Sequence, residues 1–225
     1  MMSRINKVIG ALCVGALVVA AGQQASGAIV TQPTGETGDY RLIFVTSTTT
    51  QATESSAEYY NDFVYDLAVS VPELAALNTT WTVAGNLNGI GPWENTGTEG
   101  DDDIPIYRLD DQVFAADYTA LKGAPTIPVA ITETGEVASG GVWTGMGETM
   151  SVPTYSSTTY IGYGGSVGRA QPNYTWYTWG QYTEDPETEN HLYAMSGVIP
   201  EPATGGLLLL GATAFLGLLR RKLHG

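Results

Sequence analysis

The sequence of 225 residues has little cysteine, little histidine and few basic residues. Its one cysteine, Cys13, lies in an apolar run near the start, so the rest of the chain has no disulfide and no thiolate metal site. Of the two histidines, only His191 lies away from the chain ends. No His-Glu-x-x-His pattern is present, and no glycine-rich loop is followed by lysine, which argues against a zinc protease and a nucleotide-binding enzyme. We therefore expect a protein that is not an enzyme.

The scarcity of basic residues leaves the middle of the chain strongly acidic. The sequence has 9 Lys and Arg against 23 Asp and Glu. Residues 29–199 keep only four of these bases, Arg41, Arg108, Lys122 and Arg169, against 22 acids, so their formal charge is −18. Such a surface repels nucleic acid and anionic membranes, and we expect neither as a partner of this region.

The end of the chain combines three features in a fixed order. Pro200-Glu201-Pro202 comes first, and its prolines prevent a continuous helix and leave an extended peptide for a protease. Residues 205–219 then form an uncharged apolar run, slightly short for a bilayer span of about 17–25 residues. The basic residues that follow stay on the cytoplasmic side and orient the helix; they are Arg220, Arg221 and Lys222.

This arrangement resembles the PEP-CTERM sorting signal of bacterial exported proteins, whose sorting is ascribed to a membrane protease, exosortase. The resemblance covers the last residues only, 199–225. It implies that the chain sits in the inner membrane transiently through residues 205–219. Cleavage near Pro200–Pro202 then releases it to the cell surface or the extracellular matrix. The alternative is a surface protein that keeps this single helix as its anchor.

The start of the chain has the features of a signal peptide. Arg4 and Lys7 precede an apolar run at residues 8–21, and Ser26 and Ala28 are small enough for the −3 and −1 positions of a signal peptidase site. We therefore expect a signal peptide at residues 1–28, an exported domain at 29–199 and a sorting signal at 200–225. A permanent N-terminal anchor is the alternative.

The hydrophobic pattern of the exported domain predicts an α+β fold. An apolar run at Tyr40–Thr46 is typical of a buried strand. Apolar residues at helical spacing predict a helix over Ser55–Val71, with a capping box from Ser55 to Glu58 and an end at Pro72. A second, short helix is expected at Val113–Leu121. Further strands are expected at Trp81–Ala84, Ile104–Leu109, Val142–Thr144, Thr158–Tyr163, Trp176–Tyr182 and Leu192–Ile199.

The order of these segments resembles a bacterial exported domain family of unknown function that has a C-type-lectin-like fold. The resemblance implies a single domain in which one main helix packs on a mostly antiparallel sheet, with Tyr40–Thr46 and Leu192–Ile199 close together. A signal helix precedes this domain and a transmembrane helix follows it. The Glu-Pro-Asn and Trp-Asn-Asp patterns of calcium-dependent lectins are absent, so the resemblance assigns no calcium ligand.

Two groups of residues are candidates for ligand binding. An aromatic cluster in the last third of the domain offers rings that stack on sugars, although such rings more often pack in a core. Its residues are Trp176, Tyr177, Trp179 and Tyr182. An acidic run is the candidate for calcium, which is bound by several oxygens of a flexible loop, although a solvated acidic loop is the simpler interpretation. Its residues are Asp101, Asp102 and Asp103.

These features together favour an exported, non-enzymatic module that binds extracellular polysaccharide. Its processing partners are signal peptidase and exosortase, and no cofactor is expected other than calcium at the acidic run. Two other functions stay open from the sequence. One is a secreted hydrolase that uses carboxylates, and the other is a structural matrix component with no defined ligand.

Overall fold

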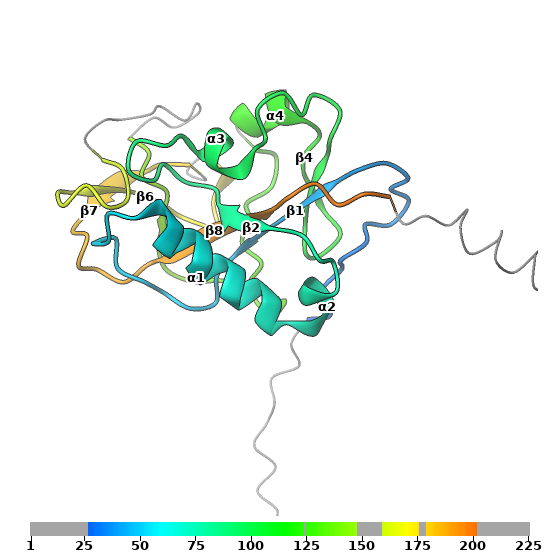
Figure 1. The fold of residues 1–225 in the computed structure, drawn as a ribbon, viewed down its shortest axis with the longest axis horizontal. Helices are drawn as coiled ribbons and strands as arrows, with labels where there is room; N and C mark the ends of the chain where they lie inside the picture. Colours follow the sequence, from blue (N-terminus) through cyan, green and yellow to red (C-terminus); the bar gives the residue numbers. More distant parts are fainter. Residues whose placement is uncertain (1–26, 124, 148–158, 176–178, 202–225) are drawn as a thin grey trace, which may run out of the picture.

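A mixed sheet of eight strands organises the domain (Figure 1). The computed structural model describes residues 27–123, 125–147, 159–175 and 179–201. The strands are β1 (Arg41–Val45), β2 (Trp81–Val83), β3 (Ile106–Arg108), β4 (Val113–Ala115), β5 (Val142–Trp143), β6 (Val167–Ala170), β7 (Tyr182–Glu184) and β8 (His191–Ser196). The helices are α1 (Ala57–Ser70), α2 (Pro72–Ala75), α3 (Pro92–Thr96) and α4 (Tyr118–Lys122).

The last strand, β8, lies at the centre of the sheet. It pairs antiparallel with β1 along one edge, where Phe44 faces Ala194. Along its other edge it pairs first with β5, in parallel, and then with β2, antiparallel. β3 and β4 extend the sheet beyond β1, whereas β6 and β7 extend it beyond β5. The parallel pairs are β1 with β3 and β5 with β8, and the other pairings between these strands are antiparallel.

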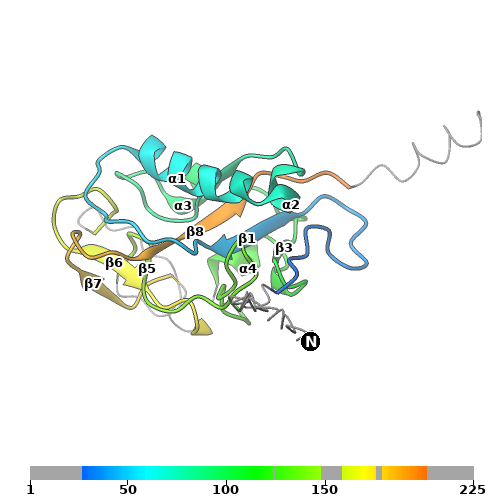
Figure 2. The same cartoon turned by 90° about the horizontal axis from the view of Figure 1, so that it is seen from below.

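Both faces of the central strands are buried. Alternate residues of a strand point to opposite faces, so Leu42 and Phe44 of β1 belong to one core cluster and Ile43 and Val45 to another. Figure 2 shows α1 and α2 along one face, while α4 lies beyond the opposite face. We call these the α1 face and the α4 face. Because both faces are covered, β1 is apolar at every position after Arg41.

The predicted main helix is confirmed as α1. Its buried residues Tyr60, Val64 and Ala68 recur every four positions and pack on the α1 face. The predicted capping box is wrong: the N-cap residue is Ser56, and no side chain caps the helix. α1 ends before Pro72, which begins the short helix α2, because proline fits the first turn of a helix but not its interior.

The short helix predicted at Val113–Leu121 is wrong for its first part. Residues Val113–Ala115 form β4, which pairs with β3, and only Tyr118–Lys122 form a helix. Asp117 marks the change, since its carboxylate accepts a hydrogen bond from Ala120 N at 2.6 Å and caps α4. α3 is a further short helix, in a segment for which the sequence predicts no helix.

The two ends of the domain meet, as predicted. Tyr40 N donates to Ile199 O at 3.1 Å, and Ile199 N donates back to Tyr40 O at 2.8 Å. Of the helices in the described ranges, none is long and apolar enough to cross a membrane. The predicted signal helix and the predicted transmembrane segment, residues 205–219, lie outside the described residues.

Candidate functional site

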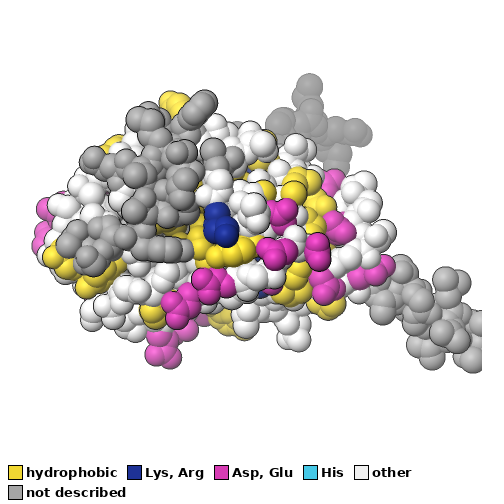
Figure 3. Space-filling view, turned by 90° about the horizontal axis from the view of Figure 1, so that it is seen from above, with side chains coloured by type: hydrophobic (Ala, Val, Ile, Leu, Met, Phe, Trp, Pro, Cys, Tyr) yellow, Lys and Arg dark blue, Asp and Glu magenta, His cyan; other side chains and the backbone are white. Residues whose placement is uncertain are grey.

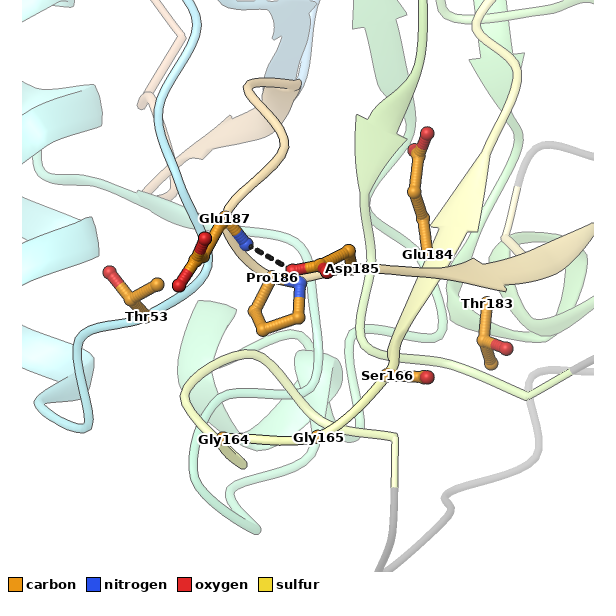
Figure 4. Close-up of a pocket in the computed structure, with 9 residues that line it drawn as sticks. All are labelled: Thr53, Gly164, Gly165, Ser166, Thr183, Glu184, Asp185, Pro186 and Glu187. Atoms are coloured by element: carbon orange, nitrogen blue, oxygen red, sulfur yellow. Dashed lines mark hydrogen bonds between the residues drawn. The ribbon is translucent and has the colours of Figure 1, made fainter.

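A polar cleft of about 490 Å³ lies at one end of the β6–β7 pair. These strands are antiparallel, with Val167 opposite Glu184, so the loop before β6 and the turn after β7 come together. The loop contributes Gly164–Ser166, and the end of β7 with the turn after it contributes Thr183–Glu187. Thr53 completes the lining, and in Figure 4 it lies beside Glu187, while Ser166 and Thr183 lie on the other side.

Glycines and a short turn give the cleft its shape. Gly164 has a φ of 77°, a left-handed conformation that favours glycine. On the other wall, Glu187 N donates to Asp185 Oδ1 at 2.9 Å, the dashed line in Figure 4. Ala52 N also donates to Pro186 O at 2.8 Å, which ties this turn to the segment before α1. Hydrogen bonds therefore hold the wall of residues 185–187, while glycine conformation shapes the opposite loop.

The carboxylates of the cleft differ in their partners. Glu184 accepts a hydrogen bond from Asn190 Nδ2 at 3.0 Å, and its Oε2 lies 3.1 Å from Arg169 Nε. That contact is an ion pair by distance, although its angle does not make a hydrogen bond. Asp185 and Glu187 are exposed. The cleft thus presents two exposed carboxylates to a ligand, of which Asp185 already accepts from Glu187 N, whereas Glu184 is held in the wall.

An exposed aromatic ring lies beside the same loop. Tyr163 is 43% exposed, and its ring packs against that of Tyr160 in a T-shaped contact with centroids 5.1 Å apart. A Cβ at Gly165 would lie 2.9 Å from Tyr163 Cε1, so the ring covers the backbone of the loop. Aromatic faces bind the C–H faces of sugars, and Tyr163 offers such a face.

The basic residues of the domain are all engaged elsewhere in the described structure. Arg41 pairs with Asp101, and Arg108 and Arg169 pair with Asp110 and Glu184. Lys122 Nζ lies 4.0 Å from the ring centre of Tyr118. On the face in Figure 3, acidic side chains are spread widely and basic ones form a single small patch. The described surface has no cluster of cations for an anionic ligand.

The aromatic cluster predicted as a binding surface is divided by the structure. Trp179 is only 5% exposed and packs on the α4 face against Trp93, Phe114 and Tyr193. Tyr182 is half-buried, with Arg169 Cζ 4.8 Å from its ring centre. Trp179 is therefore part of the core, and Tyr182 is engaged by Arg169 on its ring. The other two members, Trp176 and Tyr177, lie outside the described residues.

The acidic run predicted for calcium is held by a buried arginine. Arg41, 4% exposed, donates from Nε to Asp101 Oδ2 at 2.8 Å and from its other nitrogens to the carbonyl oxygens of Thr96, Gly97 and Ser196. No three His, Cys, Asp or Glu side chains gather into a metal-holding group anywhere in the described ranges. Asp101, Asp102 and Asp103 are accordingly neighbours in sequence without forming such a group.

The predicted sorting residues stand directly outside the folded domain. Ile199 is buried, whereas Pro200 and Glu201 are exposed. Glu201 N lies 3.4 Å from Asp39 Oδ1 as a long hydrogen bond. Pro202, Arg220, Arg221 and Lys222 lie outside the described residues.

Sequence reasoning missed the cleft, although two patterns pointed to it. Gly164-Gly-Ser-Val-Gly168 matches the Gly-x-Ser-x-Gly pattern of hydrolase nucleophiles, yet Ser166 precedes strand β6 rather than a helix. His191 is no base for it, because its Nδ1 and Nε2 lie 2.6 Å and 2.9 Å from the carbonyl oxygens of Thr46 and Ser139. The second pattern, Glu184-Asp-Pro-Glu187, is the other wall.

Comparison with known proteins adds no identity to these observations. No protein-family model matches the chain, and no curated protein matches its sequence.

Proposed function

We propose that this chain is an exported, non-enzymatic module that binds extracellular polysaccharide, and that the cleft between Gly164–Ser166 and Thr183–Glu187 is its binding site. The observation that carries the proposal is that exposed carboxylates line the cleft and that an exposed tyrosine, Tyr163, precedes the loop that forms one of its walls. Carboxylate oxygens accept hydrogen bonds from sugar hydroxyls, and Tyr163 stacks on the ring of a neighbouring unit.

The charge of the domain favours an uncharged polysaccharide. Its four basic residues are engaged by carboxylates or by a ring, and the cleft itself carries Asp185 and Glu187. An acidic glycan would meet repulsion without a compensating cation. Calcium at Asp101–Asp103 is a secondary hypothesis, in which the ion screens this charge or bridges to the ligand.

The proposed fold family is C-type-lectin-like, and the proposed route is export with processing at both ends. Three features support this: α1 on a mixed sheet, chain ends that meet at Tyr40 and Ile199, and the exposure of Pro200 and Glu201. Signal peptidase would cut after Ala28 and exosortase near Pro200–Pro202, releasing the domain to the surface or matrix. Mass spectrometry of the secreted protein tests the route, and an intact apolar tail on it would refute processing.

A glycan array with and without a calcium chelator tests the binding function. Neutral glycans should bind with a preference of at least tenfold over uronic-acid polymers. Tyr163→Ala and Glu187→Ala should each lower the affinity about tenfold, because they remove the stacking ring and an exposed acceptor group. Tyr59→Ala is the matched control, since Tyr59 is similarly exposed, at 45%, but lies on α1.

The other outcomes of the same experiment separate the rival functions. Cleavage of any bound glycan would show that the protein is a hydrolase rather than a binding module. Unchanged affinity in both cleft variants would move the site elsewhere. Failure to bind under any condition would leave a structural matrix component.

A further inference from the structure

A second hollow joins the predicted signal peptidase site to a buried carboxylate. This groove, of about 350 Å³, is lined by Gly27, Ala28 and Ile29 on one side and by Glu133 and Thr134 on the other. The junction of α1 and α2, including Glu73, closes it. The peptide bond that signal peptidase is predicted to cut, between Ala28 and Ile29, therefore borders the groove.

Glu133 is a buried acid without a cationic partner. Its side chain is 2% exposed, and it accepts hydrogen bonds from Ser47 N at 2.8 Å and from Ser47 Oγ. No Lys, Arg or His among the described residues forms an ion pair with it: the four basic residues have the partners given above, and both nitrogens of His191 face carbonyl oxygens. Burying an uncompensated carboxylate is costly, so a cation at this groove would stabilise the fold.

The chain around Ile29 is fixed in position. Val30 N donates to Leu109 O at 2.7 Å, and Ile29 packs against the core of the α1 face. On the other side, a Cβ at Gly27 would lie 2.8 Å from Gly135 O, so the backbone at residue 27 rests against the turn that follows Glu133. Ile29 would therefore keep its place at the groove after residues 27 and 28 are removed.

We propose that cleavage after Ala28 supplies the missing cation, and that the new amino terminus of Ile29 binds Glu133. Hydrolysis of the Ala28–Ile29 bond consumes one water, leaves a carboxylate on the departing signal peptide and frees an amine on Ile29. A free α-amine has an ordinary pKa of about 7.7–8.0, so it carries a proton at neutral pH. The resulting ammonium enters the groove beside Glu133. This inference rests on the proposed export and is independent of the glycan site.

Three forms of the domain, residues 29–201, test the proposal. These residues contain both core clusters and the paired chain ends. The first form begins at Ile29 with a free amine, the second is Nα-acetylated at Ile29, and the third keeps Ala28, which shifts the ammonium by one residue. We expect the first form to melt on the order of 5 °C above the other two, because only it pairs Glu133 with a cation at the right place.

Two variants identify the carboxylate. Glu133→Gln should abolish the difference between the free and acetylated forms, since the ammonium then has no buried anion to bind. Glu73→Gln is the matched control, because it removes an exposed carboxylate from the same groove and should preserve the difference. Equal melting temperatures of the three wild-type forms, or a difference that survives Glu133→Gln, would overturn the proposal.

A chemical measurement keeps the proposal testable if Glu133→Gln does not fold. The α-amine of the folded wild-type domain should react with an acylating reagent at least tenfold more slowly than the same amine in the urea-unfolded chain. Equal rates would mean that the amine is free in solution, contrary to the proposal. Glycan binding is measured separately, so failure of one proposal leaves the other intact.

Discussion

The two faces of the sheet use the same strands but are covered in different ways. On the α1 face, one regular helix supplies Tyr60, Val64 and Ala68 to Leu42 and Phe44 of β1. On the α4 face, the cover comes from separate segments of short helix and loop. Its large side chains include Trp93, Phe114, Leu121, Val129 and Trp179. The α1 face is thus covered mainly by one helix whose buried residues recur at helical spacing. The α4 face is instead covered by short segments that lie far apart in the sequence.

The faces also differ in the hydrogen bonding of their buried tyrosine hydroxyls. On the α1 face, Tyr40 Oη donates to Thr31 O at 2.8 Å, and Tyr60 Oη accepts from Glu54 N at 2.9 Å. On the α4 face, Tyr193 Oη is buried with no hydrogen-bond partner in the described structure, whereas each face has one buried indole N–H without a partner, Trp81 Nε1 on the α1 face and Trp179 Nε1 on the α4 face. Burial also raises the pKa of Tyr193. The faces therefore differ in their tyrosine hydroxyls: those of Tyr40 and Tyr60 have hydrogen-bond partners, and that of Tyr193 has none in the described structure.

The largest expected effect on stability is that of a substitution in the core of the α1 face. Phe44→Ala should lower the free energy of unfolding by about 3–5 kcal/mol, because Phe44 is fully buried and packs on Trp81 with ring centres 5.1 Å apart. Urea denaturation measures this loss. Val113→Ala is the control, since Val113 is 47% exposed and should cost less than about 0.5 kcal/mol. A loss below about 1 kcal/mol for Phe44→Ala would show that the α1 face is not the main core.

An intermediate effect is expected at the rim of the α1 face, where Tyr107 Oη donates to Glu36 Oε2 at 2.6 Å. This bond, followed by that from Gly38 N, lowers the pKa of Glu36. The stabilisation is therefore present above the ordinary glutamate pKa of about 4.3 and is lost as pH falls through the lowered value. Burial, with the bond to Glu36, raises the pKa of Tyr107 to about 12, so stability is also lost as pH rises above about 10.

Glu36→Gln measures this contribution directly. Near pH 7 it should cost about 1 kcal/mol, and it should flatten the acid side of the stability curve obtained by denaturation between pH 2 and 7. Glu58→Gln, a change of equal charge on the exposed side of α1, is the control. If the stability curve of Glu36→Gln between pH 2 and 7 were identical to that of the wild type, Glu36 would not be the source of this pH-dependent stabilisation.

The smallest effect on stability is expected on the α4 face. Tyr193→Phe removes a buried hydroxyl that has no partner, so stability should change by less than about 0.5 kcal/mol or increase. Tyr60→Phe is the matched comparison, because its hydroxyl is hydrogen-bonded, and it should cost about 1 kcal/mol. If Tyr193→Phe proved the more costly of the two, the distinction between the faces would fail.

The elements of the α1 face were predictable from the sequence, and those of the α4 face were not. Strands at Tyr40–Thr46 and Trp81–Ala84 and the helix α1 follow from local apolar patterns, and the structure confirms them. β4 was missed because Val113–Ala115 fits a helical spacing as well as a strand, and only its pairing with β3 decides between them. A short segment carries too little periodicity to choose alone.

The meeting of the two patterns that form the cleft was missed for a related reason. Its walls are two turns separated by a strand pair, and β6 has glycine at its second position and little apolar pattern. Turn residues show that the chain reverses but not which other turn it meets. Trp179 illustrates the same limit, since an aromatic in a polar, tyrosine-rich stretch is equally compatible with an exposed platform and with the buried position that it occupies.

The central position of β8 has a consequence for the order in which the protein folds. Leu42 N donates to Ser196 Oγ across 154 residues of chain, and β2 and β5 also need β8 as a partner. Until β8 is available, β1 and β2 lack the strand that joins them, so the sheet cannot close. Contacts of such sequence separation make folding slow, because the entropy of a long loop is lost before the contact forms. The central sheet can therefore be completed only after β8, near the end of the domain, has been synthesised.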